Sequence, residues 1–300
     1  MRRSIIFLVT LLFLFISWPA SGAESVKINF VSALYEDAAG VALKYPEGVA
    51  CGANSFWVAD TGNSRILRLT LREDKLQVDT VFPLTSNSAP LVVQVNSKGN
   101  IYVLDGRERR IIKLSSTGEH KGFMALADLP GAKESVLRSF KIDAKDNIYL
   151  LDIFSGRVVI LNPSEQYVKQ IPFPKGYGFF SDLAIDDQGT IYLLDSVKAV
   201  VYSAVSGSDI FSPLTRGMKD LMNFPVSIAL DNRGILYLSD QYGSGLALVG
   251  RDGSFLGRKL GAGRAESLLY YPAQLCINHA GYLLIADRSN SRAQLFVLAE

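Results

Sequence analysis

Six short apolar segments, each ending in aspartate, recur along the chain at nearly constant spacing. Successive segments lie 43 to 47 residues apart and end at Asp60, Asp105, Asp152, Asp195, Asp240 and Asp287. Each is a run of aromatic and branched aliphatic residues bounded by turn-forming residues. A helix would instead place apolar residues at three- and four-residue intervals. The pattern therefore predicts six β-strands, one in each repeat.

Each repeat contains further strands that can be located from its aspartate. Six residues before it stand residue types that tolerate a positive φ in a hairpin turn: Asn54, Gly99, Asp146, Gly189, Gly234 and Gly281. An apolar strand precedes that turn, as at 226–230. A four-residue loop after the aspartate leads to a third strand, as at 110–114, and a more variable fourth strand follows, as at 167–171. Four antiparallel strands in about 45 residues describe one propeller blade, so the predicted fold is an all-β, six-bladed β-propeller of four-stranded antiparallel blades.

The sixth repeat offers only three strands before Glu300, so one strand must come from elsewhere. Residues 26–30 alternate in polarity, which is typical of a half-buried edge strand. We expect this N-terminal strand to be the outer strand of the last blade, where it closes the ring and covers an open sheet edge.

The segment from Tyr45 to Leu69, YPEGVACGANSFWVADTGNSRILRL, resembles an NHL repeat, as do the segments Pro90–Leu114 and Pro272–Phe296. The shared pattern is a proline, an apolar strand, a turn, a strand ending in aspartate, a short loop, then arginine and an aliphatic strand. The third and fourth copies depart from it, with Leu137 and Phe180 in place of proline. The resemblance implies a six-bladed propeller but no single function, because NHL-type propellers include lyases, protein- and RNA-binding modules and extracellular scaffolds.

The first 23 residues have the layout of a secretory signal peptide. Arg2 and Arg3 precede an apolar run from Ile5 to Trp18, which is followed by a proline and small residues up to Ala23. An uncleaved membrane anchor is the alternative, although the run is short for a membrane-spanning helix. We expect cleavage after Ala23, export to the periplasm or the extracellular space, and a single propeller domain over residues 24–300.

The net charge of the chain indicates which classes of binding partner are expected. The chain has 31 basic and 29 acidic residues. Because Arg2 and Arg3 belong to the leader, the remaining charges balance. Nucleic-acid binding draws most of its affinity from basic residues, so a nucleic-acid partner is not expected.

The recurrent aspartates have a structural explanation. Four of them are followed five positions later by arginine, and the two side chains then stand opposite each other in an antiparallel hairpin: Arg65, Arg110, Arg157 and Arg292. In the fourth and fifth repeats Val200 and Gly245 replace the arginine, which predicts free carboxylates on Asp195 and Asp240.

The positions of the two histidines limit the catalytic mechanisms that the chain could support. His120 and His279 lie away from the expected channel mouth, so neither a histidine-dependent lyase site nor a Ser/His/Asp triad can be assembled.

Cys51 and Cys276 fall on inner strands of blades that neighbour each other across the ring closure. Two buried thiols are favoured, because inner strands of adjacent blades often lie too far apart for a disulfide. The alternative is a disulfide, which an oxidising compartment would permit.

These observations favour a non-catalytic, monomeric scaffold that binds an envelope or extracellular protein, peptide or glycan without a cofactor, although they do not decide whether the protein is an enzyme. Binding is expected on the face formed by the loops that lead into the inner strands and by the loops after the recurrent aspartates, through Arg109, Arg138, Asp182, Tyr242 and Gln274. The alternative is a calcium-dependent hydrolase or lyase resembling the lactonase-type propellers, with Glu47, Asp182, Asp195 and Asp240 as metal ligands.

Overall fold

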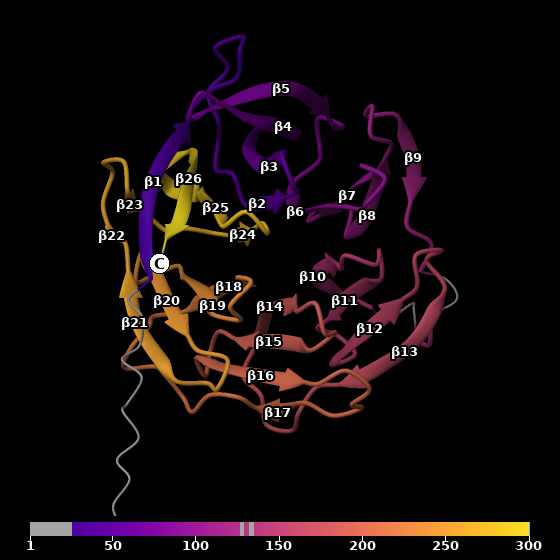
Figure 1. Cartoon of the computed structure of the whole chain (residues 1–300). Helices are drawn as coiled ribbons and strands as arrows, with labels where there is room; N and C mark the ends of the chain where they lie inside the picture. Colours follow the sequence, from indigo (N-terminus) through magenta and orange to yellow (C-terminus); the bar gives the residue numbers. More distant parts are fainter. Residues whose placement is uncertain (1–25, 127–128, 132–134, 300) are drawn as a thin grey trace, which may run out of the picture.

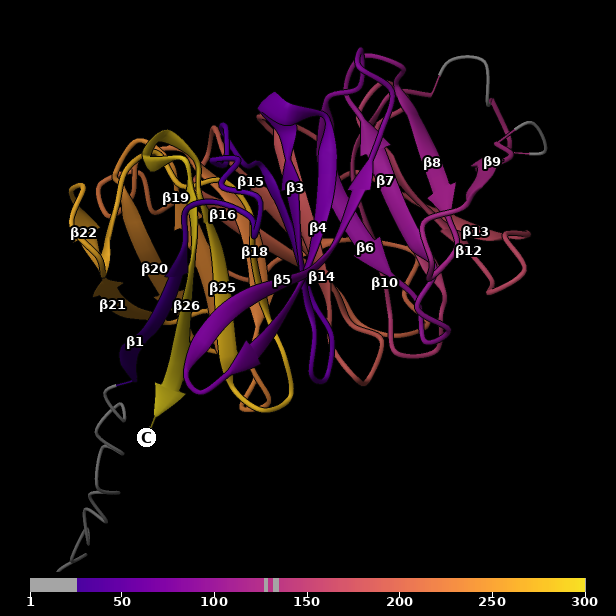
Figure 2. The ribbon, with the colours of Figure 1, turned by 90° about the horizontal axis from the view of Figure 1, so that it is seen from above.

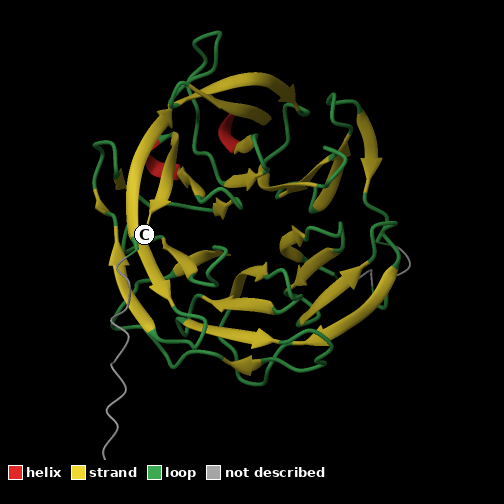
Figure 3. Cartoon of the chain, viewed as in Figure 1, coloured by secondary structure: helices red, strands yellow, loops and turns green. Residues whose placement is uncertain are grey.

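A computed structural model describes residues 26–126, 129–131 and 135–299, which form a ring of six four-stranded antiparallel sheets (Figure 1). Nearly all regular structure in this part of the chain is strand, apart from the 3-10 turns η1 (Thr61–Asn63) and η3 (Arg288–Asn290) (Figure 3). The prediction of an all-β, six-bladed propeller is confirmed. The predicted signal peptide, residues 1–23, lies outside the described residues. No helix in the described ranges is long and apolar enough to cross a membrane.

Each blade is a meander whose first strand faces the centre of the ring. Blade 1 consists of β2 (Gly48–Cys51), β3 (Phe56–Asp60), β4 (Arg65–Arg72) and β5 (Lys75–Pro83), and blade 2 of β6 (Pro90–Val95), β7 (Ile101–Asp105), β8 (Arg110–Leu114) and β9 (His120–Phe123). Blade 3 consists of β10 (Leu137–Ile142), β11 (Ile148–Asp152), β12 (Arg157–Leu161) and β13 (Tyr167–Pro172), and blade 4 of β14 (Phe180–Ile185), β15 (Ile191–Asp195), β16 (Val200–Ala204) and β17 (Ser212–Pro213). Blade 5 consists of β18 (Pro225–Leu230), β19 (Leu236–Asp240), β20 (Gly245–Val249) and β21 (Phe255–Lys259). A short parallel pair, β22 (Gly261–Ala262) and β23 (Leu268–Leu269), lies between blades 5 and 6.

Blade 6 combines the two ends of the chain. Its strands are β24 (Leu275–Ile277), β25 (Tyr282–Asp287), β26 (Arg292–Ala299) and, outermost, β1 (Lys27–Leu34), which pairs antiparallel with β26. The N-terminal strand therefore closes the ring, as predicted, and it removes the open edge that β26 would otherwise present.

The hydrophobic core lies between neighbouring blades, which stand side by side around the ring (Figure 2). Between blades 3 and 4, for example, Leu151 and Val158 pack with Phe180 and Leu193. Both faces of each blade are covered in this way, so the second strand of blades 1 to 5 is buried at every position. This burial explains why those strands are continuous apolar runs in the sequence.

The turns between the first and second strands follow the prediction in five blades. Gly99, Asp146, Gly189, Gly234 and Gly281 have φ between 62° and 82°. Asn54 does not adopt a positive φ, so the expectation for blade 1 is wrong. This repeat is one residue shorter, and its turn is closed by a hydrogen bond from the Gly52 N–H to the Ser55 carbonyl.

The same five turns share a second feature, which was not among the predictions from the sequence. Nine residues before the recurrent aspartate stands an Asn or Asp whose Oδ1 accepts hydrogen bonds from the N–H groups two and four residues later: Asn96, Asp143, Asp186, Asp231 and Asn278. These side chains stabilise the turn in the manner of an Asx-turn. Blade 1 has Cys51 at the equivalent position.

Cys51 and Cys276 form a disulfide between β2 and β24, with their Cα atoms 5.7 Å apart. The favoured expectation of two buried thiols is therefore wrong. The inner strands of blades 1 and 6 approach closely enough, because the ring narrows toward its centre and brings successive inner strands side by side. The bond joins segments 225 residues apart in sequence at the point where the ring closes.

Candidate functional site

The six recurrent aspartates belong to the framework that shapes the loop face, the end of the ring where the loops lead into the inner strands. All six are fully buried. In every blade the carboxylate accepts a hydrogen bond from a backbone N–H of the loop that leads into the inner strand; the donors are Lys44, Ala89, Val136, Gly178, Asn223 and Tyr270. The aspartates thus hold the loops that carry the candidate binding residues.

Asp152 illustrates the electrostatics of this framework. Its burial alone would raise the pKa of the carboxyl group. Hydrogen bonds from the backbone of Val136 and Ser155, and from the side chains of Ser135 and Arg157, outweigh that effect and lower the pKa below its usual value. The carboxylate is therefore the form that stabilises the fold.

Three of the four predicted aspartate–arginine pairs are present and buried. The Nε atoms of Arg65, Arg157 and Arg292 lie 2.7, 3.1 and 2.8 Å from the aspartate five residues earlier. The prediction for Arg110 is wrong: it pairs with Glu108, and its guanidinium lies over the ring of Phe123. Asp105 instead accepts backbone N–H groups of its own loop and of Ala89.

Asp195 and Asp240 were expected to be free, and they are not. The Asp195 carboxylate accepts four backbone N–H groups, those of Gly178, Phe179, Val197 and Lys198. Asp240 forms an ion pair with Arg258 of β21, with Nη1 2.5 Å from Oδ2. A more distant partner thus replaces the missing arginine in blade 5, and backbone donors replace it in blade 4.

The side chains at the mouth of the central channel are positioned by β-bulges. In blades 2 to 5 the pairing of the first two strands skips one residue just after the inner strand begins: Leu91, Arg138, Ser181 and Val226. A bulge changes the direction in which its extra side chain points. Glu47 and Ala273 occupy the corresponding position in blades 1 and 6.

These six residues, one from each blade, line a small cavity of about 40 Å³ together with Val92, Gln241 and Gln274. We call it the mouth cavity. Glu47 is neutralised by Arg288, whose Nε lies 2.5 Å from Oε1. Arg138 makes no ion pair with any described residue. The Gln274 side-chain oxygen is buried and accepts no hydrogen bond.

The mouth cavity is therefore lined by a cation without a counter-ion in the described part of the chain and by a buried acceptor without a donor. An unsatisfied buried polar atom costs stability, and a bound polar group can supply its partner. The arrangement suits a ligand group that carries negative charge toward Arg138 and donates a hydrogen bond to Gln274.

Asp182 lies beside the mouth cavity residues and is fully buried. Its two carboxylate oxygens accept hydrogen bonds from Ser139 and Ser227 at 2.7 and 2.8 Å, and Lys141 Nζ lies 3.4 Å from Oδ2. This cluster joins the inner strands of blades 3, 4 and 5. Asp182 therefore has its hydrogen-bonding capacity occupied by the protein.

The structure brings together only part of the predicted site. Arg138 and Gln274 line the mouth cavity, and so does Glu47 from the alternative metal set. Arg109 is exposed on the β7–β8 loop and does not line it. Tyr242 is 53% exposed and stacks on Phe224, next to the lining residue Gln241. The other bulge positions, Leu91, Ser181 and Val226, were missed because alternation along a strand does not reveal an inserted residue.

The four proposed calcium ligands Glu47, Asp182, Asp195 and Asp240 do not converge. No group of three or more His, Cys, Asp or Glu side chains in the described ranges is arranged to hold a metal ion. The structure does not bring this ligand set together: Asp195 and Asp240 are bound by groups of blades 4 and 5, whereas Glu47 and Asp182 are held by side chains of neighbouring blades.

The fold and the mouth cavity define a six-bladed β-propeller with a polar site on its axis. No protein-family model and no curated protein matches the sequence. Solved structures do match the fold. Virginiamycin B lyase from Staphylococcus aureus is 12% identical, with a TM-score of 0.63, over 91% of this chain and 100% of the lyase. A gluconolactonase from Xanthomonas campestris is 16% identical, with a TM-score of 0.67, over 93% and 92%.

A Bacteroides thetaiotaomicron protein of unknown function is 14% identical, with a TM-score of 0.67, over 92% of this chain and 76% of that protein. At these identities the likeness concerns the fold. Since the neighbours include enzymes and proteins of unknown function, the fold alone does not separate a binding scaffold from an enzyme.

Proposed function

We propose that this chain is a non-catalytic, exported propeller of the NHL type, which binds a protein, peptide or glycan of the envelope or the extracellular space at the mouth cavity. The observation that carries the proposal is that two residues with unused binding capacity line the same cavity. Arg138 has no counter-ion among the described residues, and the buried side-chain oxygen of Gln274 accepts no hydrogen bond. The ligand group that enters would be anionic and would carry a hydrogen-bond donor.

The state of the other polar groups supports binding rather than general acid–base catalysis. Asp182 is held by two serine hydroxyls, and Glu47 is paired with Arg288. His279 lies in the β24–β25 turn with its Nδ1 3.1 Å from Asn232, and His120 lies on the outer strand β9. Of these groups only Glu47 lines the mouth cavity, and its carboxylate is paired with Arg288; Asp182 and the two histidines do not line it.

The Cys51–Cys276 disulfide supports export, because disulfides persist in oxidising compartments and are rare in reducing ones. It is independent of the leader and of the mouth cavity. Isolation of the protein from the envelope and medium fractions, followed by N-terminal sequencing, tests the exported location directly.

The binding proposal is tested by affinity capture from the native envelope, with the wild type and the double variant Arg138→Ala/Gln274→Ala as baits. Arg251→Ala is the matched control, because it removes an exposed arginine from the β20–β21 turn, on the face opposite the mouth cavity. A partner that is retained by the wild type and the control but weakened at least about fivefold by the double variant supports the proposal.

Equal capture by all three proteins would overturn the proposed site. Saturable lactone hydrolysis or lyase activity by the purified protein after calcium loading would overturn the non-catalytic assignment and favour the enzymatic alternative. The Tm of the double variant should match that of the wild type, since neither side chain makes an ion pair with the described part of the chain.

A further inference from the structure

Blade 4 has an unusually short outer strand. β17 contains two residues, whereas the outer strands of the other blades contain four to nine. After Pro213 the chain turns toward blade 5, where Met218 and Met222 join the core formed with Ile228 and Leu238. The side of blade 4 next to β16 is therefore left without a complete covering strand.

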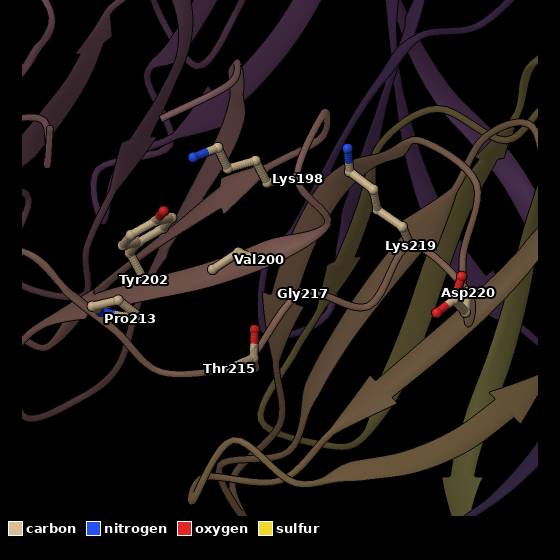
Figure 4. A pocket seen from close by; sticks show the side chains of 8 residues that line it. All are labelled: Lys198, Val200, Tyr202, Pro213, Thr215, Gly217, Lys219 and Asp220. Atoms are coloured by element: carbon tan, nitrogen blue, oxygen red, sulfur yellow. The ribbon is translucent and has the colours of Figure 1, made fainter. Parts of the chain in front are cut away.

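The space left by this short strand is a groove of about 480 Å³ (Figure 4). One wall is formed by Val200 and Tyr202, which share a face of β16 because they occupy alternate positions, and by Lys198 of the preceding loop. The other wall comes from the segment after β17: Pro213, Thr215, Gly217, Lys219 and Asp220. The volume lies in the range of small-molecule sites. We call this site the wall groove.

Two hydroxyl groups on largely buried side chains line the wall groove. Tyr202 and Thr215 are 7% and 5% exposed. Thr215 Oγ1 accepts the Val201 N–H at 3.0 Å, which leaves its own O–H to donate. Burial, and then the negative charge of Asp195, raise the pKa of Tyr202, so its phenol remains a donor. Both groups can donate to a bound oxygen atom.

The rim of the wall groove carries more positive than negative charge. In Figure 4 Lys198 extends to the left and Lys219 upward, and Asp220 lies to the right of Lys219. Lys198 Nζ donates one hydrogen bond to the Gly176 carbonyl and has further N–H groups available. Lys219 forms no ion pair with a described residue. The rim thus carries two ammonium groups and one carboxylate.

We propose that the wall groove is a second binding site, for a small organic anion with an apolar body. The anionic group would lie between Lys198 and Lys219, and the apolar body against Val200, Pro213 and the Tyr202 ring. The hydroxyls of Tyr202 and Thr215 would donate to its oxygen atoms. None of the residues of the wall groove lines the mouth cavity, so the two sites are independent.

The test uses the mature protein and the fluorescent anion 8-anilinonaphthalene-1-sulfonate, with octanoate and octanol as competitors. We expect saturable binding that octanoate displaces and octanol does not, since only octanoate carries the charge. Each of Lys198→Gln and Lys219→Gln should weaken binding about two- to fivefold, the range for partly exposed charge pairs.

Gly217→Leu supplies a variant that fills the wall groove without altering charge. A Cβ at Gly217 meets nothing closer than the Lys198 carbonyl at 3.6 Å, and the residue does not have a left-handed φ, so the side chain is tolerated. We expect binding to fall at least about tenfold. Gly261→Leu is the matched control, because its Cβ meets only Leu268 at 3.9 Å.

Retention of full affinity by Gly217→Leu, or equal competition by octanol, would overturn the proposal. Loss of affinity in Arg138→Ala/Gln274→Ala would also overturn it, because the probe would then occupy the mouth cavity. Sedimentation with phosphatidylglycerol vesicles that is lost in Gly217→Leu would identify the anion as a lipid headgroup. Displacement by monomeric octanoate without vesicle binding would identify it as a free organic acid.

Discussion

The Cys51–Cys276 disulfide closes a loop that spans most of the propeller, so its removal should have a large effect on the free energy of unfolding. The two cysteines are 225 residues apart. In the chain-entropy description, a bond that closes a loop of this length restricts the unfolded chain by about 5 kcal/mol. Native disulfides commonly contribute about 2 to 5 kcal/mol, and we expect a value in this range.

The perturbation is the double variant Cys51→Ala/Cys276→Ala, which removes the bond without leaving a polar group in a partly buried site. Guanidinium unfolding can be followed through Trp57, which is largely buried and is the only tryptophan among the described residues. A Cβ at Gly52 would lie 3.0 Å from the Trp57 ring, so the ring also reports on the chain next to Cys51.

The wild type under reducing conditions should unfold at the same midpoint as the double variant. Both should unfold at clearly lower denaturant than the oxidised wild type. Coincident midpoints for the oxidised wild type and the double variant would refute the reasoning, because they would mean that strand β1 alone holds the ring closed.

Three further outcomes follow from the described contacts. Deleting residues 24–35 removes β1 and exposes the edge of β26, so the Tm measured by circular dichroism should fall much further than after a tail truncation; an unchanged melt would contradict the closure. Arg292→Met removes the only cation paired with the buried Asp287 carboxylate among the described residues and should cost about 3 to 5 kcal/mol in urea unfolding. The exposed control Arg110→Ala should change the free energy of unfolding by less than about 0.5 kcal/mol, and equal effects would contradict the role of burial. Because the pKa of Asp152 is lowered in the folded protein, its contribution is complete above its unfolded pKa of about 3.9 and is lost as the pH falls through the folded pKa. Asp152→Asn should therefore be less stable than the wild type at pH 7, with a gap that narrows below about pH 4; a gap independent of pH would contradict the shift.

The side chain that stabilises the turn between the first and second strands of a blade could have been predicted from the sequence. The Asn or Asp nine residues before the recurrent aspartate recurs in five repeats, as at Asn96 and Asp186, and its role depends only on residues two and four positions later. In the first repeat Cys51 stands at this position instead. This exception would have indicated that Cys51 has a different structural role.

Other features could not be predicted from spacing. Asp240 is neutralised by Arg258, 18 residues away on another strand, and Arg110 prefers Glu108 to the expected aspartate. The side chains that line the mouth cavity depend on bulges. Of the bulge residues, only Arg138 was expected from the sequence to contact a ligand; Ser181 and Val226, which line the same cavity, were not.

The sequence by itself determined the number of blades, their four-stranded order and the closing strand. These features arise from hydrogen bonds and apolar alternation within hairpins of fewer than 50 residues, and such short-range patterns repeat visibly along the chain. The tertiary structure alone decided which side chains meet across the ring. Contact between Cys51 and Cys276, or between the bulge residues of six blades, depends on how closely the blades pack around the axis, and that spacing is a property of the whole ring.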